Sequence, residues 1–218
     1  MHATVTPLRI AAVVLAAGRS SRMGTDKLRL SWRGRMLLEW VLDAACALSP
    51  VVLVGGPPGL VHRSPGLIRL PAPLEAAQAG PAPVLAPDTQ LQRADVKEVL
   101  PGQADSLKAG IRALPPGLDG AMVLLGDMPQ VTPELVAKLA LAFNPGHFLV
   151  PRCGGRRGNP VIIPAQWFDK VLELEGDTGA RPLLIRPDAP VDYLDVDDPA
   201  VLADVDTPED YSRLRNQP

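Results

Sequence analysis

The sequence predicts an α/β fold in which a parallel sheet is covered by helices on both sides. Residues 10–17 form a short, continuous apolar run that ends at Gly18, which is typical of a strand buried on both faces. Residues 36–48 then carry apolar side chains at helical spacing and stop before Pro50, which cannot continue a helix. Residues 51–54, followed by two glycines, indicate a second strand. This alternation of strand, helix and strand predicts a parallel sheet.

The rest of the chain continues the alternation after a segment with little pattern. Residues 57–101 are rich in Pro and Ala, and within them only residues 67–70 are interpreted as a strand. Thr132 and Pro133 suit the N-cap and the first position of a helix. The other expected elements are a helix at 104–113, strands at 121–125, 148–150 and 161–163, and further helices beyond them. Because no internal repeat or long linker is present, we expect residues 1–218 to form a single domain.

The composition is that of a globular protein without a strong overall charge. Hydrophobic residues make up 46% of the 218 residues, which is enough for a sizeable core, and the formal net charge is -2. We therefore expect no binding to nucleic acid or to a membrane. There is no signal-peptide layout and no apolar run of about 18 residues. The two cysteines, Cys46 and Cys153, are too few and too differently placed for a disulfide framework, so we expect a cytoplasmic protein.

The loop after the first strand has the composition of a phosphate-binding loop. Ligands gather at the carboxyl ends of parallel strands, where Gly18 and Gly24 would let backbone N–H groups approach phosphate oxygens. Between positions 19 and 35 there are six basic residues and one acidic residue, an excess that the whole chain does not show. The spacing fits neither GxGxxG nor the Walker pattern GxxxxGK(S/T), because two residues separate Gly24 from Lys27. The loop therefore predicts a triphosphate site of another type.

Asp127 is the first candidate metal ligand. It stands at the carboxyl end of the apolar strand at 121–125. Mg²⁺ prefers one or two carboxylates together with phosphate oxygens and water. The alternative is that Asp127 only begins a turn before Pro129.

An acidic segment supplies the second candidate ligand. Residues 188–210 hold nine acidic residues and neither Lys nor Arg, and we expect most of them to form a solvated surface. Within this segment, Val205 and Asp206 resemble a strand end that precedes a helix capped by Thr207. Such a cap would fix one carboxylate in place. We take Asp206 as the second ligand of Mg²⁺, with Asp204 as its rival.

A loop rich in arginine and glycine, residues 151–160, is a candidate binding site for a second phosphate compound. It holds Arg152, Arg156 and Arg157 among three glycines between two expected strands. Guanidinium groups bind phosphate through two hydrogen bonds, and glycines allow close approach. The alternative, equally compatible with the sequence, is a basic turn with solvated arginines.

Six motifs follow one another along the chain: LAAGRSSRMGTDK at 15–27, GQADSLKAGI at 102–111, LLGDMPQVTPELV at 124–136, GGRRGNPVIIP at 154–164, GDTGARPLL at 176–184 and DVDTPEDY at 204–211. Together they resemble the molybdenum cofactor nucleotidyltransferases, and most closely the cytidylyltransferase branch. The resemblance implies a Rossmann-like three-layer α/β/α sandwich with a mostly parallel sheet. It also implies Mg²⁺-dependent transfer of CMP from CTP to the phosphate of molybdopterin cofactor, with pyrophosphate as the second product.

The resemblance also assigns roles to individual residues. The catalytic residues would be Lys27, Arg22 and Asp127. The nucleotide-binding residues would be Leu15, Ala16, Ala17, Gly18, Gly24, Lys27, Gly55 and Ser106. The acceptor-binding residues would be Arg156, Arg157, Asn159, Asp177 and Arg181. The metal ligands would be Asp127 and Asp206, and the product would pass to a molybdenum hydroxylase by transient contact.

Two other functions stay open. The first is a related nucleotidyltransferase that uses GTP or acts on a sugar or polyol phosphate, because the fold and the phosphate loop serve several acceptors. Asn159, where the cytidylyltransferase branch often has histidine, leaves room for another acceptor. The second is a carrier that holds the finished pterin cofactor without catalysis. A carrier has no need of Lys27, Asp127 and Asp206.

Overall fold

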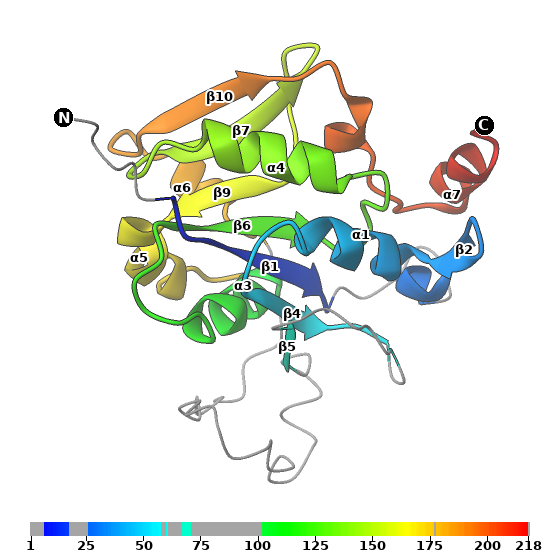
Figure 1. The fold of residues 1–218 in the computed structure, drawn as a ribbon, viewed down its shortest axis with the longest axis horizontal. Helices are drawn as coiled ribbons and strands as arrows, with labels where there is room; N and C mark the ends of the chain where they lie inside the picture. Colours follow the sequence, from blue (N-terminus) through cyan, green and yellow to red (C-terminus); the bar gives the residue numbers. More distant parts are fainter. Residues whose placement is uncertain are drawn as a thin grey trace, which may run out of the picture.

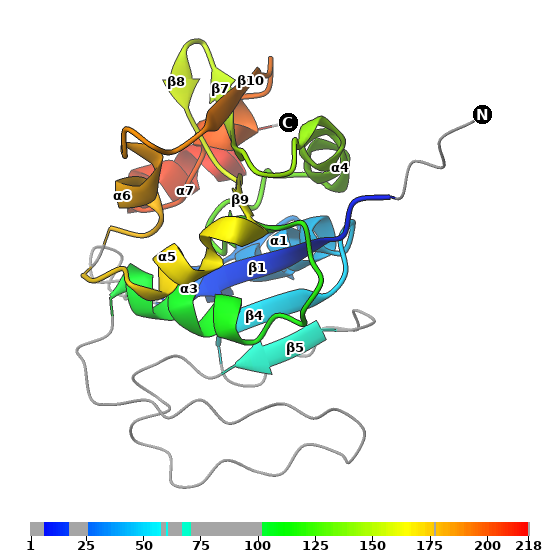
Figure 2. The ribbon, with the colours of Figure 1, turned by 90° about the vertical axis from the view of Figure 1, so that its left-hand side faces the viewer.

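The computed structural model describes residues 7–17, 26–57, 60, 67–70, 102–176 and 178–217. These residues build an eight-stranded sheet (Figure 1). Its strands are β1 (Ile10–Ala16), β4 (Val51–Gly55), β5 (Leu67–Leu70), β6 (Gly120–Leu125), β7 (Phe148–Cys153), β8 (Arg156–Arg157), β9 (Val161–Pro164) and β10 (Val191–Asp195). The order across the sheet is β10-β7-β9-β6-β1-β4-β5, with β8 paired to β7, so that β5 and β10 lie at opposite edges (Figure 2).

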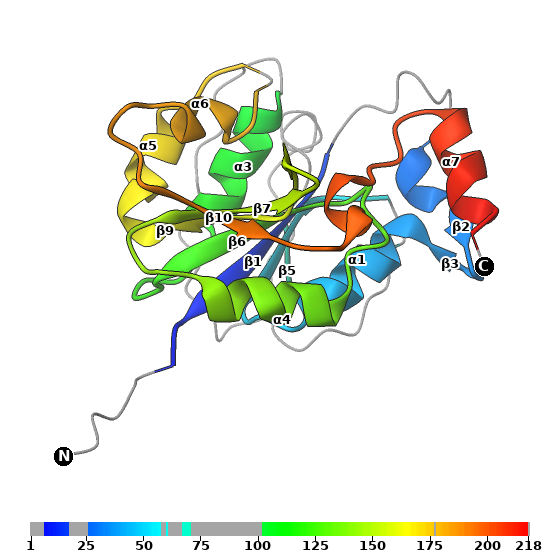
Figure 3. The same ribbon diagram turned by 90° about the horizontal axis from the view of Figure 1, so that it is seen from above.

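Helices cover both faces of the sheet and complete three layers (Figure 3). One face carries α1 (Leu37–Ala45) and α4 (Pro133–Ala142), and the other carries α3 (Gln103–Arg112), α5 (Phe168–Leu172) and α6 (Arg181–Leu184). The described residues also form three short 3-10 helices: η1 (Lys27–Arg29), η2 (Ala165–Trp167) and η3 (Pro199–Leu202). The α/β/α sandwich that the sequence predicts is confirmed. In the described part of the chain, the helices are too short or too polar to cross a membrane.

Strand β1 shows how the layers are joined. All of its residues are buried, and from Ala12 to Ala16 they alternate between two apolar clusters. Ala12 and Val14 belong to the cluster beneath α1 and α4, whereas Val13 and Leu15 belong to the cluster beneath α3 and α5. Gly110 of α3 lies so close to β1 that a β-carbon there would collide with the Val13 side chain. The continuous apolar run in the sequence is therefore the run of a strand covered on both faces.

The strand directions place several carboxyl ends at one edge of the sheet. Strand β1 pairs in parallel with β4 and β6, and β7 pairs in parallel with β10. Strand β9 is antiparallel to both β6 and β7, so β6 and β7 point the same way. The prediction of a mostly parallel sheet is confirmed. The loops that follow β1, β4, β6 and β7 consequently share one edge of the sheet, which is where ligands bind in folds of this kind.

A small substructure lies at this edge. The hairpin of β2 (Ser31–Trp32) and β3 (Arg35–Met36) stands beside α7 (Pro208–Arg215), as Figure 1 shows. One buried apolar cluster contains Trp32 of the hairpin, Leu214 of α7, and Val205 from the segment before α7. The hydroxyl group of Tyr211 donates to the carbonyl oxygen of Ser31 at 2.6 Å. The substructure therefore joins the segment after η1 to the end of the described chain.

Several boundaries differ from those predicted. The helix expected at 36–48 forms at Leu37–Ala45, and the strand expected at 148–150 extends to Cys153. The strand expected at 67–70 is present as β5. Strand β8, strand β10 and the β2–β3 hairpin were not predicted. Strands β2, β3 and β8 have only two residues each, which is too short for a recognisable pattern, and β10 lies within the acidic segment that was expected to be surface.

Candidate functional site

Lys27 links two carboxylates at the carboxyl edge of the sheet. Its Nζ atom donates to Oδ2 of Asp127 at 2.6 Å and to Oδ1 of Asp206 at 2.6 Å. The side chains of Lys27 and Asp127 are largely enclosed, with 12% and 18% of their surface exposed, whereas Asp206 is 41% exposed. Lys27 comes from η1, Asp127 follows β6, and Asp206 precedes α7. The three residues that the sequence identified are thus brought together from distant parts of the chain.

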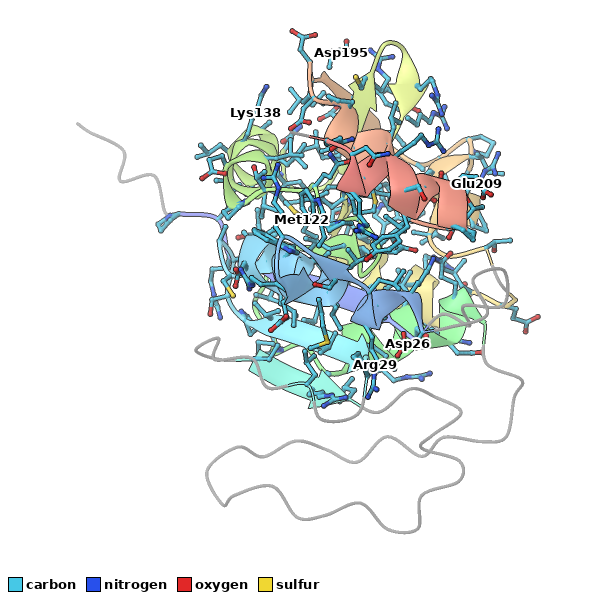
Figure 4. The ribbon with its side chains drawn as sticks, turned by 90° about the vertical axis from the view of Figure 1, so that its right-hand side faces the viewer. Asp26, Arg29, Met122, Lys138, Asp195 and Glu209 are labelled. Atoms are coloured by element: carbon cyan, nitrogen blue, oxygen red, sulfur yellow. The ribbon has the colours of Figure 1, made fainter. Side chains whose placement is uncertain are left out.

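The short helix η1 sets the direction of Lys27. The Asp26 side chain caps this helix by accepting a hydrogen bond from the N–H of Leu28 at 3.2 Å. Leu28 is buried in the apolar cluster beneath α1, which anchors the turn. Asp26 was not singled out from the sequence, although an aspartate just before a helical turn is a common N-cap signal. Figure 4 shows Asp26 and Arg29 on this segment, on the same side of the molecule as α7.

Asp127 is held close to β1 by the glycine that precedes it. The N–H of Gly126 donates to the carbonyl oxygen of Leu15 at 2.9 Å. A β-carbon at Gly126 would lie 3.1 Å from that same oxygen, so glycine permits the close approach. Asp127 consequently lies next to the end of β1, after which the sequence predicts the phosphate-binding loop.

Asp206 lies in a connecting segment and not at a strand end, so that part of the prediction is wrong. The N–H of Val205 donates to the carbonyl oxygen of Asp127 at 3.0 Å, a contact between two loops that continues into no strand. The predicted helix cap is confirmed, since Thr207 is the N-cap of α7 and Pro208 is its first residue. The carboxylate is therefore fixed by a loop contact on one side and a helix start on the other.

The charges of the site favour a protonated Lys27. Burial alone would lower the pKa of the Lys27 ammonium, but the adjacent Asp127 and Asp206 carboxylates outweigh burial and raise that pKa above its ordinary value. The pKa of Asp204 is raised by partial enclosure of its carboxyl group and by the charges of Asp206 and Asp127, although much of the residue is exposed. Asp204 thus adds to the negative potential around Lys27.

One oxygen of the site is buried without a partner. Oδ1 of Asp127 is enclosed and accepts no hydrogen bond from the described residues. An unpaired buried carboxylate oxygen costs about 1 to 3 kcal/mol, so such an atom indicates a missing ligand. No group of three or more His, Cys, Asp or Glu side chains suited to a metal occurs within the described ranges. Two carboxylates completed by phosphate oxygens and water is the arrangement that Mg²⁺ prefers.

The nucleotide-binding residues expected near the first strand lie together where the structure describes them. Ala16 is the last residue of β1 and Ala17 follows it, and a β-carbon at Gly55 would lie 2.9 Å from the carbonyl oxygen of Ala16 and from Cα of Ala17. The positive φ of Gly55, 86°, also favours glycine. Ser106 is a buried polar residue in the first turns of α3. Leu15 is buried within β1. Gly18, Arg22 and Gly24 lie outside the described residues.

The arginines expected to bind the acceptor extend from the β7–β8 hairpin. Arg156 and Arg157 form β8 and are exposed, and Arg157 lies over the Tyr193 ring at 5.1 Å. Asn159 donates its N–H to the carbonyl oxygen of Val201 at 2.8 Å. Arg181 begins α6 on the face covered by α3. Asp177 lies outside the described residues. The acceptor role of these residues stays a prediction.

The fold is that of the α/β nucleotidyltransferases, with a lysine and two carboxylates at the carboxyl edge of the sheet. Residues 12–191 match the family described as "MobA-like NTP transferase domain". The chain belongs to this family, and its activity class is nucleotidyl transfer.

Similar proteins cover almost the whole chain. It is 33% identical to the "Purine catabolism protein PucB" of Bacillus subtilis (strain 168) over 93% of this chain and 94% of that protein. It is 26% identical to the "Molybdenum cofactor cytidylyltransferase" of Escherichia coli (strain K12) over 93% of each chain. The crystal structure of Rv0371c from Mycobacterium tuberculosis H37Rv in complex with manganese is 25% identical, covers 96% of this chain and 100% of that one, and has a TM-score of 0.72.

Proposed function

We propose that this protein is a single-domain cytoplasmic enzyme that transfers CMP from CTP to the phosphate of molybdopterin cofactor. The products would be molybdopterin cytosine dinucleotide and pyrophosphate, and a molybdenum hydroxylase would receive the dinucleotide through transient contact. Two observations support the choice of nucleotide and acceptor: the motifs of the cytidylyltransferase branch and the similarity to the Escherichia coli protein over 93% of the chain. The nucleotidyltransferase family itself covers residues 12–191.

The observation that carries the proposal is the position of Lys27 between Asp127 and Asp206. Two carboxylates hold a cation at 2.6 Å from each, and Oδ1 of Asp127 is buried without a hydrogen-bond partner among the described residues. In a carrier protein, this charge cluster would cost desolvation free energy and would have no function. A phosphotransfer enzyme uses both charge signs, because carboxylates hold a divalent cation and a lysine binds phosphate oxygens.

Asp127 and Asp206 would hold Mg²⁺ in the complex with nucleotide. The bound ion would neutralise charge on the phosphate oxygens as the pyrophosphate leaves. Manganese in the Mycobacterium tuberculosis neighbour supports a divalent cation in this class of fold. The donor set of carboxylate oxygens fits Mg²⁺ better than it fits a softer metal.

The protein side chains would mainly position the reactants. Lys27 would bind the triphosphate with its ammonium group, and Arg22 would neutralise the leaving pyrophosphate. Arg156 and Arg157 would hold the phosphate of the acceptor, so that one of its oxygens lies in line with the α-phosphorus. The acceptor oxygen is itself the nucleophile, so the chain supplies no nucleophilic side chain. Catalysis then rests on alignment and on charge neutralisation.

The decisive experiment incubates the protein with one NTP at a time, Mg²⁺ and molybdenum cofactor, and measures pyrophosphate and dinucleotide. We expect both products with CTP. Dinucleotide from GTP alone, or pyrophosphate release only with a sugar or polyol phosphate, would replace the proposal by the related nucleotidyltransferase activity. Binding of the cofactor without pyrophosphate from any NTP would identify a carrier.

A further inference from the structure

Asp210, in the first turn of α7, contacts the backbone of the residue that carries the second carboxylate of the site. Its Oδ2 atom accepts hydrogen bonds from the N–H of Asp206 at 3.2 Å and from the N–H of Thr207 at 2.8 Å. The same oxygen accepts the hydroxyl of Thr207 at 2.7 Å. In return, the N–H of Asp210 donates to Oγ1 of Thr207 at 3.2 Å. The carboxylate therefore organises the Asp206–Thr207 backbone as well as the helix start.

These hydrogen bonds restrain Asp206, which lies in the connecting segment before α7 and outside any helix or strand. The preceding residue, Val205, is fixed through its N–H to the carbonyl oxygen of Asp127 and through its buried side chain. The N–H of Asp206 has Asp210 as its partner. With both flanking peptide groups held, the Cα–Cβ direction of Asp206 is set toward Lys27, whose Nζ lies 2.6 Å from its Oδ1.

The helix that carries Asp210 is itself anchored to the Lys27 segment. The hydroxyl of Tyr211, the next residue, donates to the carbonyl oxygen of Ser31 at 2.6 Å. Leu214 is buried against Trp32 and Leu37. The segment 27–37 thus begins with Lys27 and also contains the residues that hold α7 in place. Asp210 is consequently on a fixed element and can transmit its position to Asp206.

The hydrogen bond with Thr207 outweighs partial burial and lowers the pKa of the Asp210 carboxyl group, with the N–H groups of Thr207 and Asp206 adding to the effect. The other oxygen of Asp210 pairs with the exposed Arg213. The Oδ2 atom of Asp210 accepts the N–H groups of both Asp206 and Thr207 in charge-assisted hydrogen bonds.

We propose that Asp210 is a positioning residue of the nucleotidyl-transfer site: its carboxylate fixes the Asp206 backbone and thereby the spacing of the Asp206 and Asp127 carboxylates. This rests on the proposed function, in which those two carboxylates hold the divalent cation. Residues that orient metal ligands by hydrogen bonds typically change metal affinity by about 10- to 100-fold when removed. A residue that only capped α7 would change stability and not metal affinity.

The chain offers a matched control in Glu209. It is an exposed carboxylate in the same first turn of α7, so Glu209→Ala removes the same charge from the same helix end while leaving the Asp210 contacts in place. The conservative variant is Asp210→Asn, which keeps an oxygen that can accept the Asp206 and Thr207 N–H groups. The test variant is Asp210→Ala. All three are compared with wild type well below their melting temperatures, so that the folded fraction does not differ.

The measurements are Mn²⁺ binding, by electron paramagnetic resonance of the free ion, and pyrophosphate release against Mn²⁺ concentration with CTP. We expect Asp210→Ala to raise the Mn²⁺ concentration for half-saturation at least tenfold in both measurements. We expect Glu209→Ala to stay within about twofold of wild type and Asp210→Asn within about fivefold. A loss of folded protein alone would lower the maximal rate and leave half-saturation unchanged.

The two proposals fail differently. Equal Mn²⁺ half-saturation in Asp210→Ala and Glu209→Ala, with a wild type that binds Mn²⁺ and releases pyrophosphate, overturns the positioning role alone. A wild type that neither binds Mn²⁺ nor releases pyrophosphate from any NTP overturns the proposed function, and the positioning role with it. An Asp210→Asn variant as weak in Mn²⁺ binding as Asp210→Ala also overturns the inference, because the accepting oxygen would then not be the cause.

Discussion

The backbone N–H of Val205 donates to the carbonyl oxygen of Asp127 at 3.0 Å. The hydrogen bond joins the loop after β6 to the loop before α7, although 78 positions separate these residues in the sequence numbering. A bond between backbones fixes the loops independently of their side chains. The carboxylates of Asp127 and Asp206, which both contact Lys27, therefore project from a single connected unit.

Replacing Asp127 should abolish turnover. Asp127→Ala removes a carboxylate that contacts Lys27 and whose Oδ1 is buried without a partner among the described residues. We expect pyrophosphate release to fall by far more than tenfold, which corresponds to more than about 1.4 kcal/mol of barrier, while the far-UV circular dichroism stays that of a folded chain. Asp169→Ala is the control, because Asp169 is an exposed carboxylate on α5, which lies on the sheet face opposite α1. A rate near wild type in Asp127→Ala would remove Asp127 from the site.

Replacing Lys27 should affect metal and nucleotide in opposite directions. The ammonium group lies 2.6 Å from both carboxylates, so it would compete with a divalent cation for them. Lys27→Met should therefore bind Mn²⁺ at least about tenfold more tightly without nucleotide, and should show a higher KM for CTP. Titrations followed by electron paramagnetic resonance measure the first effect and initial rates the second. Arg29→Met, an exposed cation of the same short helix, is the control. Unchanged Mn²⁺ affinity and an unchanged KM together would rule out both effects.

The start of α3 should contribute a stability that depends on acid pH. Burial would raise the pKa of Asp105, but hydrogen bonds from Lys108 and from the N–H of Gly102 outweigh it and lower the pKa. A carboxyl group with a lowered pKa in the folded state stabilises the fold above its unfolded pKa of about 3.9, and loses that contribution as the pH falls through the folded pKa. Asp105→Asn should thus lower the free energy of unfolding by about 1 kcal/mol at pH 7, with the difference shrinking below about pH 4. Urea denaturation between pH 7 and pH 3 measures it, and a constant difference over that range would contradict the linkage.

Ala17 should influence the choice of nucleobase. By resemblance it stands where guanylyl-transferring relatives tend to have a second glycine, and its Cα lies 2.9 Å from where a β-carbon of Gly55 would be. A methyl group at this strand end narrows the space for the nucleobase, which a pyrimidine tolerates better than a larger purine. A difference of this size changes substrate discrimination by about 1 to 3 kcal/mol. We expect CTP to have the higher kcat/KM in wild type and the preference to shrink in Ala17→Gly. A wild-type preference for GTP would contradict the choice of nucleotide, and an unchanged ratio in the variant would show that the base is chosen elsewhere.

The sequence predicts most of the buried framework and less of its edge. Strands β1, β4 and β6 are continuous apolar runs, because both of their faces are covered, and such runs are visible without a structure. Strand β10 is only partly buried and includes two aspartates, so its composition resembles a surface loop. Lys27, Asp127 and Asp206 were selected as one site and do meet. The contacts that bring them together, such as the Val205 N–H to Asp127, involve backbone atoms between distant positions, and no residue type encodes them.

Strand β1 lies between β4 and β6 in the sheet, and its register with β6 pairs Ile10 with Gly120 and Leu15 with Leu125. During synthesis on the ribosome, this interior strand therefore keeps one unpaired edge until residues 120–125 have emerged. The contact between Lys27 and Asp206 forms still later, because Asp206 follows Lys27 by 179 residues. Their contact can form only when α7 has left the ribosome and packed beside the β2–β3 hairpin.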